Sequence, residues 1–160
     1  MMKGQTIFFN NKPVITGAYS IVGPKEGGGN FGEYFDYVMK DDRFGEETYE
    51  KAERKMIHQA ISGAIEKSKI KVADIDLILA GDLLNQIISS SYAARDFDVA
   101  FLGIFGACST IAESLAMAGC LINGKQCKNV VCSTSSHFST AERQFRFPLE
   151  LGNQRPPSSQ

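Results

Sequence analysis

Short apolar segments of strand-like composition alternate along the chain with segments in which apolar side chains recur at helical spacing. The strand-like segments are 14–22, 75–80, 99–105 and 130–132. One helical segment begins after Thr48, a plausible N-cap residue. Two others span 83–95 and 110–123. The order is therefore β, α, β, α, β, α, β. Parallel neighbours need such crossover connections, so this order predicts an α/β fold with one mostly parallel sheet covered by helices.

The segment 25–47 separates the first predicted strand from the first predicted helix. It contains Gly27-Gly28-Gly29 together with Phe31, Tyr34, Phe35 and Tyr37. Loops of this length are usually either functional or disordered. The aromatic residues indicate a loop that packs against an apolar surface.

Composition excludes several classes of protein. The chain has 160 residues, 43% of them hydrophobic, and 17 basic against 18 acidic side chains, which indicates one globular domain that does not bind nucleic acid. The longest apolar run, Val99 to Cys108, is too short to span a membrane, and the first residues lack the features of a signal peptide.

No metal site or cofactor is expected. The four cysteines and two histidines lack the spacing of a zinc site, which indicates free thiols in a reducing compartment. Residues 119–126 have the glycines and lysine of a phosphate-binding loop, but Gln126 stands where magnesium binding needs Ser or Thr, and the segment runs from helix to strand. The end of a helix explains this segment better than nucleotide binding.

Cys108 is the first candidate site residue. The segment 105–110, Phe-Gly-Ala-Cys-Ser-Thr, joins a predicted buried strand to a helix through small residues, as in a nucleophile elbow. The amides and partial positive charge at the start of that helix favour a thiolate and an oxyanion. A buried, inert cysteine is the equally weighted alternative, because that is what free cysteines most often are.

Asp82 directly follows the second strand, and Asn85 follows three residues later. Carboxyl ends of parallel strands share one edge of the sheet, so Asp82 is expected near Cys108. A turn or N-cap role for Asp82 is the alternative that we favour.

Ser133-Thr134-Ser135-Ser136-His137 follows the last strand, at the same edge. Hydroxyl-rich strand ends suit polar ligands, although a plain turn is nearly as good an explanation. His137 is either a base for Cys108 or a hydrogen-bonded structural residue. Farther along, Arg143 and Arg146 either clamp a carboxylate or pair with neighbouring glutamates.

Three stretches together resemble the stage V sporulation protein AD family of spore-forming bacteria. They are LAGDLLNQ at 79–86, FGACST at 105–110, and TSSH at 134–137 followed by TAERQFR at 140–146. The resemblance covers nearly the whole chain. It implies the thiolase fold, which is similar to that of β-ketoacyl synthases and contains two related α/β halves, of which residues 1–160 are the first.

The resemblance also implies a role and a location. The role is to bind dipicolinic acid (pyridine-2,6-dicarboxylate) for uptake into the developing spore, alongside membrane-bound subunits of the same transport system. The implied location is peripheral, on the cytoplasmic face of the spore or forespore inner membrane, and we expect a homodimer. An acyltransferase that uses Cys108 as nucleophile is the alternative, although its remaining catalytic residues belong to the second half.

The same resemblance implies a set of ligand-binding residues. Cys108 and Asp82 match the family motifs and are carried over as ligand-binding residues. Their expected neighbours at the edge are Asn85, Ser135, Ser136, His137 and Arg143. Because part of the cover of the sheet comes from the other half, residues 1–160 alone are expected to expose apolar surface.

Overall fold

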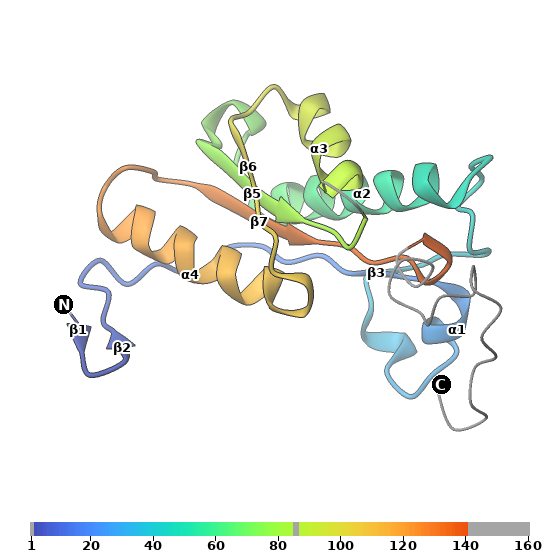
Figure 1. Cartoon of the computed structure of the whole chain (residues 1–160), viewed down its shortest axis with the longest axis horizontal. Coiled ribbons are helices and arrows are strands. Elements are labelled where there is room, and N and C mark those ends of the chain that lie inside the picture. Colours follow the sequence, from blue (N-terminus) through green and yellow to red (C-terminus); the bar gives the residue numbers. More distant parts are fainter. Residues whose placement is uncertain (1, 85–86, 141–160) are drawn as a thin grey trace, which may run out of the picture.

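The computed structural model describes residues 2–84 and 87–140 (Figure 1). At its centre lies a three-stranded parallel sheet of order β6-β5-β7. These strands are β5 (Leu77–Gly81), β6 (Phe101–Gly103) and β7 (Val130–Thr134). The long helices are α2 (Tyr49–Ser68), α3 (Ile88–Ala94) and α4 (Thr110–Asn123). The predicted alternation of buried strands and crossover helices is confirmed for this part of the chain.

The two faces of the sheet bury different side chains of β5, because alternate residues of a strand point to opposite sides. Ile78 and Ala80 pack into a core with α2 and α3, which includes Ile57 and Ile61. Leu79 packs on the opposite face with Ala118 of α4 and with Ile104. Figure 1 shows this layering, with α2 and α3 on one side of the sheet and α4 on the other.

The α2 helix begins where the sequence predicts. Thr48 has extended backbone, and its Oγ1 accepts a hydrogen bond from the Lys51 amide at 3.3 Å, which satisfies one of the free N–H groups of the first turn. At the other end, Lys69 takes a left-handed conformation (φ 61°) and its amide donates to the Glu66 carbonyl oxygen. The cap and the left-handed residue thus define both ends of the helix.

The turns after α2, α3 and α4 each contain a non-glycine residue in the left-handed region. These residues are Lys69 after α2, Asp98 after α3 (φ 53°) and Lys125 after α4 (φ 62°). The 3-10 turn η4 (Arg95–Phe97) lies between α3 and Asp98. Glycine usually fills such positions, yet Gly124 is right-handed here and the following lysine turns the chain.

The first predicted strand is mostly wrong. Only β3 (Ile21–Val22) is a strand, and it pairs in parallel with β4 (Tyr37–Val38). Residues 13–19 have no backbone hydrogen bond to any part of the chain that the structure describes, and Val14 is 77% exposed. A strand requires a hydrogen-bonded neighbour, which the composition of a segment cannot specify.

Residues 17–19 instead lie directly on α2 at two glycines. A Cβ atom at Gly17 would lie 2.4 Å from the carbonyl oxygen of Ala64, and one at Gly63 would lie 2.4 Å from the ring of Tyr19. These are closer than ordinary van der Waals contact. The absence of a side chain at Gly17 therefore allows the backbone of this segment to contact the helix.

Two other predicted elements are shorter than the sequence suggests. The strand predicted at 99–105 is only β6, and Leu102 in it is 46% exposed, because β6 lies at the edge of the sheet. The helix predicted at 83–95 begins only at Ile88, after a left-handed Ile87 (φ 50°). Residues 2–7, for which no element was predicted, form a hairpin of β1 (Met2–Lys3) and β2 (Thr6–Ile7).

The long segment 25–47 contains short elements: α1 (Pro24–Gly27), the 3-10 turn η1 (Gly32–Tyr34), and β4. Its aromatic residues behave in two ways, since Tyr37 packs on Phe44 while Phe31 and Tyr34 are largely exposed. An ion pair between Lys67 and Asp36 ties the segment to α2 and lowers the pKa of Asp36. Within the described residues, no helix is both long and apolar enough to cross a membrane.

Candidate functional site

Three segments converge at the carboxyl end of β5. The Ser135 amide donates to the Gly81 carbonyl oxygen at 3.2 Å, which brings the chain after β7 beside the end of β5. A Cβ atom at Gly81 would lie 2.1 Å from the Ile104 carbonyl oxygen and 3.0 Å from Cγ2 of Thr110. Glycine at this position therefore lets the strand-to-helix segment around Cys108 approach the residues that follow β5 and β7.

Cys108 lies in a tight turn, as the elbow motif predicts. Ala107 takes a left-handed conformation (φ 47°), uncommon for a residue with a side chain, and opens the 3-10 turn η5 (Ala107–Ser109). This turn leads directly into α4, and Cys108 is exposed. The alternative of a buried, inert cysteine is wrong as to burial, and the reactivity of the Cys108 thiol stays a prediction. Burial instead raises the pKa of the Cys132 thiol, on β7, to about 11.

Glu113 is a neighbour of Cys108 that sequence reasoning missed. The Ser109 hydroxyl lies within hydrogen-bonding distance of the Gly106 carbonyl oxygen (2.7 Å) and of the Glu113 carboxylate. An acidic side chain in the first turn interacts favourably with the partial positive charge there, but it competes with an anionic ligand. The sequence held a signal for this contact, because Ser109 and Glu113 are four residues apart at the start of a predicted helix, a spacing that brings side chains together.

Asp82 is buried, and backbone groups occupy both of its carboxylate oxygens. Oδ1 accepts a hydrogen bond from the Leu84 amide at 2.9 Å, and Oδ2 accepts one from the Ser90 amide at 2.7 Å. These bonds shape the turn and the start of α3. The geometry of Asp82 thus fits the turn and cap role that we favoured from the sequence.

His137 is also held by the backbone. Its Nδ1 accepts a hydrogen bond from the Ser139 amide at 3.1 Å, so the ring proton of the neutral tautomer lies on Nε2 and is donated to the Asp42 carbonyl oxygen at 2.6 Å. The ring also packs against Tyr49. Both ring nitrogens are therefore hydrogen-bonded to backbone groups, and neither is free to act as a base for Cys108.

Glu53, on α2, is the second residue that sequence reasoning missed. It is fully buried, and its carboxyl oxygens contact the hydroxyls of Ser135 at 2.9 Å and Thr140 at 2.6 Å. Burial raises the pKa of Glu53, and the nearby Asp82 adds to this effect. The residue therefore joins α2 to the hydroxyl-rich segment, of which Ser136 is exposed.

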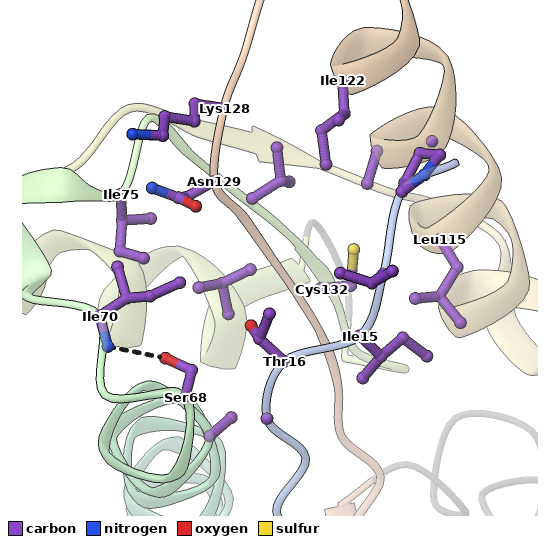
Figure 2. A pocket seen from close by; sticks show the side chains of 18 of the residues that line it. Ile15, Thr16, Ser68, Ile70, Ile75, Leu115, Ile122, Lys128, Asn129 and Cys132 are labelled. Atoms are coloured by element: carbon purple, nitrogen blue, oxygen red, sulfur yellow. Dashed lines mark hydrogen bonds between the residues drawn. The ribbon is translucent and has the colours of Figure 1, made fainter. Parts of the chain in front are cut away.

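Two cavities lie beside β7, away from Cys108. The larger, of about 530 Å³, lies between residues 13–17, α2, α4 and β7, and Figure 2 shows Ile15, Leu115 and Cys132 gathered around it. The other, of about 460 Å³, is lined in part by Ser135 and Ser136. Neither is lined by Cys108, Asp82 or His137.

The predicted site is thus only partly assembled in the described residues. Asp82, Ser135 and His137 lie at one edge with the Cys108 turn, whereas Asn85 and Arg143 lie outside the described residues. No group of three or more His, Cys, Asp or Glu residues suited to a metal ion occurs within the ranges 2–84 and 87–140.

Comparison with solved structures places this architecture. The chain matches 3-oxoacyl-[acyl-carrier-protein] synthase III from Aquifex aeolicus VF5 with a TM-score of 0.50 and 22% sequence identity, over 54% of this chain and 30% of that one. The priming β-ketosynthase from the R1128 polyketide biosynthetic pathway matches with a TM-score of 0.49 and 17% identity, over 54% and 28% of the two chains. The match to the synthase III structure shows that the fold is thiolase-like, as predicted.

Comparison with protein sequences identifies the family. Stage V sporulation protein AD of Bacillus subtilis (strain 168) is 41% identical over 155 residues, which are 97% of this chain and 46% of that protein. The chain therefore spans about half the length of this curated relative. The family model described as Stage V sporulation protein AD matches residues 3–160. The chain belongs to the stage V sporulation protein AD family.

Proposed function

We propose that the chain contributes to the binding of dipicolinic acid for its uptake into the developing spore. The observation that carries the proposal is the edge where the segments after β5 and β7 meet the Cys108 turn, at the start of the 14-residue helix α4. Helix N-termini attract carboxylate groups, because unpaired N–H groups and the helix dipole favour negative charge, so a ligand carboxylate here competes with the Glu113 side chain in the first turn of α4. Exposed Cys108 and Ser136 leave this edge accessible to a ligand.

Calorimetry with dipicolinate tests the proposal on the protein expressed from its complete reading frame. We expect saturable heat, weakened by substitution of Cys108 with a bulky residue and unchanged by Glu66→Gln on the exposed side of α2. Benzene-1,3-dicarboxylate, which lacks the ring nitrogen, is a matched control ligand. Absence of heat at millimolar dipicolinate would refute ligand binding.

A second candidate function is acyl transfer with Cys108 as nucleophile. It is favoured by the left-handed Ala107 and by the exposure of the thiol, which together present Cys108 as an elbow does. Incubation with acyl-CoA would then form a thioester on Sγ with release of the CoA thiol. Intact-mass measurement detects the adduct, which Cys108→Ser must remove, and its absence in the unchanged protein favours binding without catalysis.

We further propose that the protein is a homodimer that works at the spore inner membrane through membrane-bound subunits of the same transport system. Family membership supports this proposal. Co-purification with those subunits, using a folded variant that no longer binds dipicolinate, separates a structural role from a ligand-binding one. Loss of co-purification in that variant would show that assembly depends on the ligand.

A further inference from the structure

Glu53 occupies a position on α2 where a charged side chain is unusual. It is four and eight residues before Ile57 and Ile61, both fully buried, and so it faces the core with them. Burying an ionised carboxylate is costly unless charged partners or several donors compensate for the lost water. Within the described residues, the hydrogen-bonding partners of this carboxyl group are two hydroxyls, on Ser135 and Thr140, and no cation.

The contacts of Thr140 fit a carboxyl group that carries a proton. Oγ1 of Thr140 lies 2.6 Å from Oε2 of Glu53 and 3.0 Å from the His137 carbonyl oxygen. An ionised Glu53 makes both of these atoms acceptors, and the hydroxyl has one hydrogen to give. A proton on Oε2 satisfies both contacts, because Glu53 then donates to Oγ1 and Oγ1 donates to the His137 carbonyl oxygen, which also accepts from the Thr140 amide at 3.1 Å.

The net effect of the surroundings is to raise the pKa of Glu53. Burial has the largest effect and raises the pKa of Glu53; the Asp82 carboxylate raises it further, while the two hydroxyls and His137 lower it. The α3 helix, which packs on α2, contributes Tyr92 as its titratable residue. Both ring nitrogens of His137 are hydrogen-bonded to backbone groups, at Asp42 and Ser139.

We propose that Glu53 is a positioning residue that acts as a neutral carboxylic acid. It donates its proton to Thr140, holds the Ser135–Thr140 segment against α2, and keeps a second negative charge away from Asp82. Its consequence for ligand affinity rests on the dipicolinate binding proposed above, since an anion binds more weakly beside an ionised Glu53.

The ligand arm of the test compares Glu53→Gln with the unchanged protein, both expressed from the complete reading frame. Glutamine keeps the shape and both contacts of the neutral acid, because its amide N–H donates to Thr140 and its oxygen accepts from Ser135. Calorimetry above about pH 6, where dipicolinate is fully ionised, should show affinity falling about tenfold with rising pH in the unchanged protein, within the usual range of coupling between two sites. Glu53→Gln should keep the higher affinity, and Glu66→Gln, which changes an exposed carboxyl on α2, should follow the unchanged protein.

Infrared difference spectroscopy provides a second measurement that needs no ligand. At about pH 6, where exposed carboxyl groups are ionised, the unchanged protein should show the carbonyl stretch of a protonated carboxylic acid, and Glu53→Gln should lack it. Absence of this band in the folded, unchanged protein overturns the proposal, as do parallel affinity profiles for the two proteins. If the band is present but neither protein binds dipicolinate at any pH, only the ligand-binding function is refuted.

Discussion

Replacing Asp82 with alanine should destabilise the protein even without ligand. The side chain is 6% exposed, and its two oxygens accept hydrogen bonds from the amides of Leu84 and Ser90. A hydrogen bond to a charged group contributes about 1.5–3 kcal/mol, so the two together contribute about 3–6 kcal/mol. Removing the carboxylate also removes the cost of burying its charge, which offsets part of this loss. We therefore expect a decrease of about 3 kcal/mol in the free energy of unfolding.

Asp82→Asn separates the two hydrogen bonds. Asparagine keeps one acceptor oxygen and places an NH₂ group against the other backbone N–H, so about half of the loss is expected. Asp74→Asn is a suitable control, because Asp74 is exposed. Urea unfolding, monitored by circular dichroism, gives the free energy of unfolding of Asp82→Ala, Asp82→Asn and Asp74→Asn.

The reasoning is refuted if Asp82→Ala stays within about 0.5 kcal/mol of the unchanged protein, the usual range for a surface substitution. Loss of dipicolinate binding at full stability would instead make Asp82 a ligand-contacting residue. Loss of stability that dipicolinate does not restore supports the cap role.

Three further predictions concern other parts of the molecule. Gly17→Ala should cost about 1–3 kcal/mol, because its Cβ would lie 2.4 Å from the Ala64 carbonyl oxygen, and an unchanged melting temperature would mean that this segment does not contact α2. Iodoacetamide at about pH 8 should alkylate exposed Cys108 well before Cys132, whose thiol has a pKa of about 11. Mass spectrometry of peptides gives the order of alkylation, and alkylation of Cys132 first would contradict the prediction. Residues 1–160 alone should dimerise, aggregate or bind a hydrophobic dye, and Leu115→Lys, at a side chain 44% exposed on α4, should reduce dye fluorescence. A compact monomer that does not bind dye would contradict the last prediction.

The parts of the fold that the sequence predicts well are those with a strong local cause. The segments that became β5 and β7 are apolar runs bounded by polar or turn-forming residues, and α4 has apolar residues at helical spacing and ends before Gly124. The segment 14–22 has equally strand-like residues, yet only Ile21–Val22 pairs. Pairing depends on a partner far away in the sequence, and β4 is the partner that this segment finds.

The sequence predicts those site residues whose positions follow from the order of strands and helices alone. The end of a parallel strand places Asp82 and Ser135 at one edge, and small residues before a helix predict the turn at Cys108. Glu53 was missed because its hydroxyl partners lie 82 and 87 residues away in the chain. A glutamate on the apolar stripe of α2 was the available signal.

The left-handed residues Lys69, Asp98 and Lys125 have a practical consequence. A side chain in that conformation costs roughly 1–2 kcal/mol, and glycine adopts it without this penalty. All three lie where helices lead into strands, at the amino ends of the sheet, whereas Asp82, Cys108 and Ser135 follow its carboxyl ends. Replacing these three residues with glycine should therefore raise the thermal stability of the protein without changing the residues at the carboxyl ends of the strands.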